Sequence, residues 1–290
     1  MRLLYLLVVM IFLSCNIKQK EPIVVHNNDT DIAYTICGKG DTTLLFVHGW
    51  CINKEYWEPQ LQHFCKQYTA VAVDLPGFGK SGKNRGSWNF HNYTEDIAAV
   101  ITQLKLKNVV LIGHSMSGDI LLDFSNKYPD LICGIVGIDN LQEPAQDISE
   151  ETKKQLNVFF GIMKLKFDSV VNADMKKYLF APETDTSIVN RVMKDIYLSD
   201  PVIATTVLQS LYAVSPQQKE LMKGLNHRLD LISSSVNPVK QDSLLKYCAR
   251  GLSFKLVQAS SHYPMIENPM EFNRILQQVI YDLKLPLSPL

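Results

Sequence analysis

The residues with the clearest capacity for chemistry lie at 113–118, which read Gly-His-Ser-Met-Ser-Gly. They match the pattern Gly-x-Ser-x-Gly, directly after an apolar run and directly before a helical pattern. A serine hydroxyl is a weak nucleophile unless it is held within reach of a base, and a sharp turn between strand and helix holds it there. The N–H groups of a helix N-terminus also favour negative charge developing on a bound oxygen. We therefore predict that Ser115 is a nucleophile.

A base that activates Ser115 is expected among the histidines. The chain has seven of them, and an isolated histidine is more often structural than catalytic. His262 is distinguished by its position, because it follows the last predicted strand. A neutral imidazole there can take the proton of Ser115 and later return it to a leaving group.

A second glycine-rich stretch, residues 77–82, reads Gly-Phe-Gly-Lys-Ser-Gly and fits the pattern Gly-x-Gly-x-x-Gly. Its surroundings argue against a nucleotide-binding loop. Pro76 precedes the first glycine, no helical pattern follows, and Asp74 stands where a P-loop needs its first glycine. We interpret the stretch as a surface turn near the site and expect no cofactor.

Short apolar runs that alternate with amphipathic segments must position these residues. The run at 109–112, Val-Val-Leu-Ile, lacks alternation, as is typical of a parallel strand buried on both faces. Strands that alternate with helices predict an α/β fold with a mostly parallel, doubly wound sheet. The expected strands are 32–37, 43–47, 69–74, 109–112, 132–138, 228–233 and 252–258, and the expected helices are 92–104, 116–127 and 269–283.

Strand-like runs disappear between about residue 140 and residue 224, where helical segments rich in Lys and Met take over. We interpret residues 141–224 as a helical lid inserted between two strands of the sheet, because strand-like runs resume at Arg228 and the predicted chemistry lies on both sides. Residues 23–140 and 225–290 would then form the core.

Four motifs resemble those of the α/β-hydrolase family and follow one another in its order. Besides 113–118, residues 46–50 resemble the family's oxyanion loop after the third strand, 74–81 its turn after the fourth, and 260–269 the loop that carries its catalytic histidine. The resemblance covers nearly the whole mature chain. It implies an α/β-hydrolase fold with the lid after the sixth strand, and an oxyanion hole formed by the backbone N–H groups of Trp50 and Met116.

The acid of the implied triad is the point at which this chain departs from the family's commonest pattern. The carboxylate usually follows the strand after the lid, where residues 232–237 end at Asn237. An amide can accept a hydrogen bond from imidazole but cannot stabilise imidazolium by charge. Some members take the acid from the end of the preceding strand, where Asp139 stands. We predict Asp139 as the acid, with Asn237 as an uncharged orienter or Asp242 as alternatives.

Composition excludes several partners. Lys and Arg total 29 and Asp and Glu total 29, so the formal charge is zero, which argues against nucleic acid or an acidic surface as a partner. Hydrophobic residues make up 46% and charged residues 20%, as in a packed globular protein. The length permits one large α/β domain or two small ones.

The N-terminus carries a targeting pattern. Arg2 precedes an apolar run at 3–13, which is shorter than the roughly 20 residues of a spanning helix, and Cys15 follows closely. The segment resembles a bacterial lipoprotein signal, in which Cys15 would receive the lipid; an ordinary signal peptide is the alternative. We expect residues 1–14 to be cleaved, 15–22 to form a tether, and a lipid anchor to be the protein's contact with the membrane of the cell envelope, on the periplasmic or outer-surface side.

The remaining cysteines are odd in number and lack Cys-x-x-Cys spacing, so they predict no disulfide framework and no zinc or other metal site. Cys37 and Cys133 lie in apolar strand-like runs, where a free thiol behaves as a small hydrophobe. Cys51 and Cys65 could pair in an oxidising compartment.

An activated serine that faces two N–H donors suits acyl transfer to water. We expect a serine hydrolase acting on a small-molecule acyl substrate such as a carboxylic ester or lactone. Two alternatives stay open: an aminopeptidase or amidase resembling proline iminopeptidases, and a lipid-anchored binding protein on a hydrolase scaffold that has lost its acid. Epoxide hydrolases and dehalogenases need Asp where this chain has Ser115. The oligomeric state is not predicted.

Overall fold

The computed structural model describes residues 23–143 and 148–283. The predicted signal peptide, the tether and Cys15 lie outside the described residues. Among the described residues, no helix is both long and apolar enough to cross a membrane.

The core of the chain is an eight-stranded sheet in the order β1-β2-β4-β3-β5-β6-β7-β8. β2 pairs antiparallel with β1 and β4, and the remaining neighbours pair parallel. The predicted doubly wound, mostly parallel sheet is therefore confirmed. The strands are β1 (Ile23–Asn27), β2 (Thr30–Cys37), β3 (Thr43–Val47), β4 (Thr69–Val73), β5 (Val109–His114), β6 (Ile132–Ile138), β7 (Leu229–Ser234) and β8 (Leu252–Val257).

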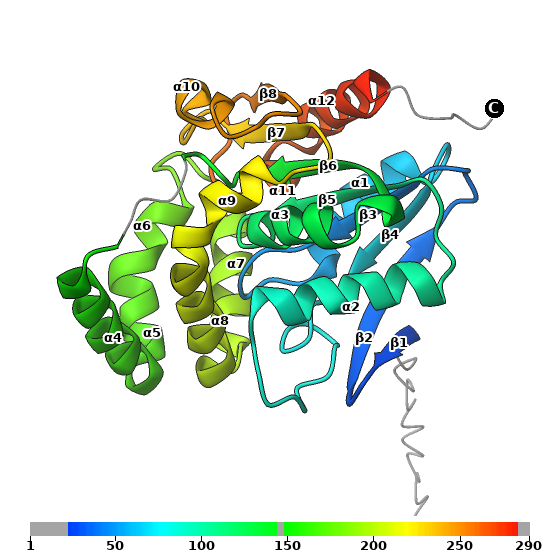
Figure 1. Cartoon of the computed structure of the whole chain (residues 1–290). Coiled ribbons are helices and arrows are strands. Elements are labelled where there is room, and N and C mark those ends of the chain that lie inside the picture. The colour runs from blue at the N-terminus through cyan, green and yellow to red at the C-terminus, as the bar shows by residue number, and fades with distance from the viewer. Residues whose placement is uncertain (1–22, 144–147, 284–290) are drawn as a thin grey trace, which may run out of the picture.

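Helices cover both faces of this sheet (Figure 1). One layer contains α2 (Phe90–Gln103) and α3 (Ser117–Lys127), and the other contains α1 (Glu58–Phe64), α11 (Pro264–Glu267) and α12 (Pro269–Asp282). The core also contains two 3-10 turns, η1 (Lys54–Trp57) and η2 (Pro129–Leu131). The short helix α10 (Gln241–Leu245) lies between β7 and β8 in the sequence.

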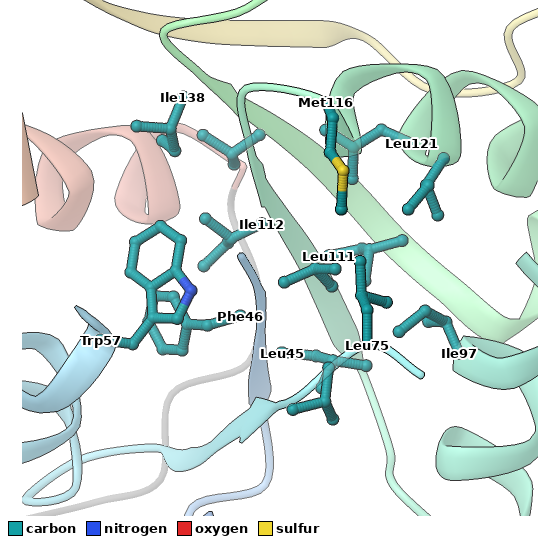
Figure 2. Close-up of a cluster of buried hydrophobic side chains, with 14 of the residues drawn as sticks. Leu45, Phe46, Trp57, Leu75, Ile97, Leu111, Ile112, Met116, Leu121 and Ile138 are labelled. Carbon is teal, nitrogen blue, oxygen red and sulfur yellow. The ribbon is translucent and has the colours of Figure 1, made fainter. Parts of the chain in front are cut away.

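Successive residues of a strand point to opposite faces, and here both faces are apolar. Leu45 and Phe46 in β3, and Leu111 and Ile112 in β5, are all fully buried. Figure 2 shows Leu111 on the side of α2 and α3, and Ile112 on the opposite side, near Trp57. Unbroken apolar runs such as 109–112 therefore reflect a sheet packed between two helical layers.

A helical insertion, α4–α9, lies between β6 and β7, as expected from the loss of strand-like runs there. Figure 1 shows α4, α7 and α8 gathered on one side of the core. The insertion comprises α4 (Glu150–Leu165), α5 (Phe167–Val170), the π-helical turn η3 (Val171–Met175), α6 (Lys176–Leu179), α7 (Thr186–Leu198), α8 (Pro201–Val214), the 3-10 turn η4 (Ser215–Gln217) and α9 (Gln218–Lys223).

Two cysteine expectations are wrong, the pairing of Cys51 with Cys65 and the free thiol at Cys37. Cys65 forms a disulfide with Cys37, whereas Cys51 is free and buried. Cys37 ends β2 and Cys65 follows α1, and their Cα atoms lie 5.5 Å apart, which is within the range that a disulfide bridges. The pairing requires β2 and α1 to be neighbours, which cysteine spacing alone does not reveal.

Removing this disulfide should destabilise the protein. The bond joins residues 28 positions apart, and a crosslink of that kind is worth about 2–4 kcal/mol, largely through the unfolded chain. We expect the double variant Cys37→Ser/Cys65→Ser to unfold at lower urea concentration than the wild type. The reduced wild type should match the variant, and an unchanged urea midpoint would contradict the assigned pair.

Candidate active site

Ser115 lies at the turn between β5 and α3, where the backbone is strained. Its φ is +51°, a conformation that residues with side chains seldom adopt. Two hydrogen bonds hold the turn: the Ser115 N–H donates to the carbonyl of Ile138 over 2.9 Å, and the Gly118 N–H donates to the carbonyl of Ser115 over 2.9 Å. The strain is thus retained by neighbouring structure, and it projects the hydroxyl away from the sheet.

The structure brings Ser115, His262 and Asp139 into one row of hydrogen bonds. The hydroxyl of Ser115 lies 2.8 Å from Nε2 of His262, and Nδ1 of His262 lies 2.6 Å from Oδ2 of Asp139. With Nδ1–H donating to the carboxylate, Nε2 is the basic nitrogen that faces the serine. The side chain of Asp139 is buried, that of His262 retains 18% of its exposure and Ser115 is half-buried, so solvent reaches the row from the serine end.

Asp139 follows β6 directly and is fixed from two sides. Its own N–H donates to the carbonyl of Ile232, and its Oδ1 accepts the N–H of Ser234 over 2.8 Å. Burial acts to raise the pKa of Asp139, but the hydrogen bond and charge of His262, together with the bond from Ser234, prevail and lower it. The carboxyl is therefore ionised at neutral pH.

The structure places neither alternative acid beside His262. Asn237 is exposed, and its N–H donates to the hydroxyl of Ser234 over 3.3 Å. Asp242 lies exposed in α10. The departure at Asn237 therefore leaves the row of three side chains complete.

The loop after β3, residues 48–50, is joined to the serine turn. The Ser117 hydroxyl donates to the carbonyl of His48 over 2.6 Å. The imidazole of His48 donates through Nδ1 to the Gly49 carbonyl and accepts the Leu75 N–H at Nε2. A Cβ on Gly49 would lie 2.5 Å from Nδ1 of His114, so only glycine fits at that position.

The backbone N–H of Trp50 belongs to the loop after β3, and the backbone N–H of Met116 belongs to the turn that carries Ser115. In the described part of the chain neither N–H has a hydrogen-bond acceptor. Both therefore remain free to donate to a bound oxygen, as the predicted oxyanion hole requires.

His114 was not predicted to act in the site, yet it contacts His262 directly. Its Nε2–H donates to the carbonyl of His262 over 2.8 Å, and the two rings lie 4.8 Å apart. Burial lowers the pKa of His114 to about 3, so this imidazole is neutral at physiological pH and positions its neighbour without adding charge. No sequence pattern distinguishes this role.

The glycine-rich turn at 77–82 does contact the site region, but through Asp74. The buried carboxylate of Asp74 accepts from Lys54 Nζ over 2.7 Å, from the Lys54 N–H over 2.7 Å and from the Lys80 N–H over 2.9 Å. This network links the turn to the segment after Trp50, in agreement with a structural turn. In the described residues no group of three or more His, Cys, Asp or Glu side chains is arranged to hold a metal ion.

Comparisons with known proteins identify the fold that carries these residues. Residues 42–174 match the family model described as alpha/beta hydrolase fold. The structure superposes on a thermophilic esterase from Thermogutta terrifontis with a TM-score of 0.78, at 18% identity over 91% of this chain and 99% of that one. This chain is an α/β-hydrolase-fold protein.

Two further relatives of this α/β-hydrolase-fold protein show how widely the fold is used. An enol-lactonase from Burkholderia xenovorans LB400 superposes with a TM-score of 0.75 at 16% identity, covering 89% of this chain and 100% of that one. A 2-(acetamidomethylene)succinate hydrolase from Mesorhizobium japonicum is 34% identical over 96 residues, which are 33% of this chain and 34% of that protein. The similarity therefore establishes the fold and leaves the substrate open.

The insertion of this α/β-hydrolase-fold protein is bonded to the loop after β3. The indole N–H of Trp50 donates to the carbonyl of Ala204 in α8 over 2.7 Å, and the hydroxyl of Tyr56 donates to Asp195 in α7 over 2.8 Å. Phe180, which follows α6, stacks on Tyr263 next to His262 with ring centroids 5.8 Å apart. These contacts place three parts of the insertion around the row of Ser115, His262 and Asp139.

A buried carboxyl in α3 makes stability depend on pH. Asp119 accepts a hydrogen bond from Gln218 over 2.6 Å, but burial dominates and raises its pKa to about 6. Because the folded state binds this proton more tightly than the unfolded chain, the stability contributed by protonation is complete below about pH 4 and is lost as pH rises through 6.

We therefore expect Asp119→Asn to stabilise the protein at pH 8, by up to about 3 kcal/mol, and to have little effect below pH 4. Urea unfolding at both pH values would measure this difference. The exposed Asp130 provides the control, since Asp130→Asn should give no comparable pH-dependent gain. A stability difference that is equal at pH 4 and pH 8 would contradict the raised pKa.

Proposed function

We propose that this protein is a serine hydrolase that cleaves a carboxylic ester, a lactone or a related acyl bond through an acyl-enzyme on Ser115. The observation that carries the proposal is the continuous row from Ser115 Oγ through both nitrogens of His262 to Asp139, with distances of 2.8 and 2.6 Å. The esterase and lactonase among the structural neighbours support the same class of reaction.

The reaction would begin as Nε2 of His262 takes the proton of Ser115 and Oγ bonds to the substrate carbonyl carbon. The carbonyl oxygen of the substrate becomes negatively charged and accepts hydrogen bonds from the N–H groups of Trp50 and Met116. The carboxylate of Asp139 stabilises the imidazolium. His262 then protonates the leaving oxygen as its bond to the carbonyl carbon breaks, which leaves the acyl-enzyme. A water molecule then gives its proton to His262 and attacks the carbonyl carbon of the acyl-enzyme. The bond to Ser115 Oγ breaks, His262 returns the proton to Oγ, and the carboxylic acid is released.

A screen of esters, lactones, thioesters and aminoacyl amides, together with labelling by a fluorophosphonate, tests the proposal. We expect covalent labelling of Ser115 and turnover of at least one ester or lactone. Turnover confined to aminoacyl amides would favour the peptidase alternative. A folded protein that is neither labelled nor active would contradict the proposal and favour a binding protein. The contact between Asp139 and His262 argues against that alternative, which supposes that the acid is missing.

We also propose that Cys15 carries a lipid that holds the protein at the cell envelope. The signal-like segment before Cys15 supports this, and the Cys37–Cys65 disulfide suits an oxidising compartment outside the cytoplasm. We expect labelled palmitate to be incorporated into the wild type in a bacterial host and lost in Cys15→Ala. The control Cys248→Ala changes a free cysteine elsewhere and should keep the label. Label retained in Cys15→Ala would contradict the anchor.

A further inference from the structure

The loop that carries His262 is held by a carboxylate that has no part in the proposed triad. Glu267 ends α11, and its side chain turns back toward the residues on both sides of His262. Oε2 accepts the Ser261 N–H over 2.9 Å, and Oε1 accepts the Tyr263 N–H over 2.9 Å. Oε1 also accepts the hydroxyl of Ser261 over 2.7 Å.

These bonds fix the backbone from which the imidazole projects. Glu267 holds the N–H before and the N–H after His262, and His114 holds the carbonyl of His262 itself. Hydrogen bonds to an ionised carboxylate are shorter and stronger than those between neutral groups. The imidazole must meet Ser115 on one side and Asp139 on the other at 2.8 and 2.6 Å, so a small rotation of its backbone would break one of the two contacts.

Glu267 does not face the reacting atoms. It borders a cavity of about 450 Å³ lined also by Thr184, Ser235 and Ser261, among residues that include neither Ser115 nor His262. It therefore acts through the backbone of the His262 loop and is a positioning residue. The side chain of Glu267 is half-buried at the border of this cavity.

The Ser261 hydroxyl extends this arrangement to the insertion. It accepts a hydrogen bond from Oγ1 of Thr184 over 3.2 Å and lies 3.2 Å from the carbonyl of Leu179. Leu179 ends α6, and Thr184 lies in the segment that joins α6 to α7. The insertion thus contacts the loop that carries His262 and that Glu267 holds in place.

We propose that Glu267 is a positioning residue that holds the imidazole of His262 between Ser115 and Asp139; this inference rests on the proposed hydrolase function. Glu267→Ala removes all three acceptor contacts. Glu267→Gln keeps one oxygen but turns an amide NH2 toward an N–H donor. Ser261→Ala removes one of the three contacts to Glu267, together with the contacts to Thr184 and Leu179, and leaves both backbone N–H groups bonded to Glu267.

Kinetics with an ester that the wild type turns over should rank these variants. A displacement of about 1 Å in a catalytic group can cost about 10²-fold, so we expect kcat to fall by about 10²-fold in Glu267→Ala, about 10-fold in Glu267→Gln and less in Ser261→Ala, with KM little changed. In a His262→Ala background, Glu267→Gln should cause no further loss, because the group it positions is absent. The control Glu271→Gln weakens only an ion pair with the exposed Arg274 and should keep wild-type kcat.

A readout that needs no turnover separates this inference from the proposed function. The Nδ1–H proton of His262, bonded to Asp139, should give a low-field proton NMR resonance in the wild type and in Glu271→Gln. It should be lost or broadened in Glu267→Ala, with the fold intact by circular dichroism.

If the wild type is inactive but its resonance is still lost in Glu267→Ala, the proposed hydrolase is overturned and the positioning role is retained. Unchanged kcat and an unchanged resonance in both Glu267 variants would overturn the positioning role. If Glu267→Ala does not fold, Glu267→Gln and Ser261→Ala decide by the same measurements.

Discussion

Replacing Ser115 with alanine should lower kcat by about 10⁶-fold, because the variant lacks the oxygen that forms the acyl-enzyme. The backbone N–H groups and the substrate-binding surfaces persist, so KM should change little and a small rate above that in water should remain. Steady-state kinetics on the best ester of the screen would measure the loss, with circular dichroism confirming the fold.

Ser125 offers a matched control for that experiment. It is a buried serine of α3, the helix that follows Ser115, and its hydroxyl contacts His227 rather than the site. Ser125→Ala should therefore keep kcat within a few-fold of the wild type. If Ser115→Ala retained more than about a thousandth of wild-type kcat on purified protein, the acyl-enzyme mechanism would be excluded.

The exchange of Asp139 for asparagine should lower kcat by about 10⁴-fold, since an amide neither stabilises imidazolium by charge nor fixes the reactive tautomer of His262. Asn237→Ala, in contrast, should leave kcat close to the wild-type value, because Asn237 is exposed and its N–H contacts Ser234. The two variants therefore distinguish Asp139 from Asn237 as the residue that orients His262. Near wild-type kcat in Asp139→Asn, or a large loss in Asn237→Ala, would reverse the assignment.

The two large effects should not add. Once Ser115 is absent, His262 has no serine proton to take and Asp139 has no imidazolium to stabilise, so the double variant Ser115→Ala/Asp139→Asn should be no slower than Ser115→Ala. A further loss of several hundred-fold in the double variant would show that Asp139 acts outside the proton transfer of Ser115, for example by maintaining the fold.

The fold could be predicted because its signals are local. The run at 109–112 is apolar at every position, and in the structure β5 is buried throughout. The expected strands at 43–47 and 132–138 agree with β3 and β6 at both ends. β1 was not predicted, since this short edge strand pairs only with β2 and its partly exposed residues give a weak periodic signal.

Ser115 and His262 could be predicted for the same reason, because each lies in a motif that follows a recognisable strand. The acid could not be decided in this way. Asp139, Asn237 and Asp242 are all polar residues after strands, and only the three-dimensional neighbourhood shows which of them His262 meets. The pairing of Cys37 with Cys65 and the contacts of Glu267 likewise depend on segments that are distant or turned back in space.

The sequence by itself determined seven of the eight strands, the bend that exposes Ser115 and the region of the insertion. These follow from apolar periodicity and from the glycine and serine of a tight turn, which act over a few residues. The tertiary structure decided the partner of every polar side chain in the site. A hydrogen bond forms only when two groups come within about 3 Å, and that proximity is set by the alignment of parallel strands, whose carboxyl ends bring residues 115, 139 and 262 to one edge of the sheet.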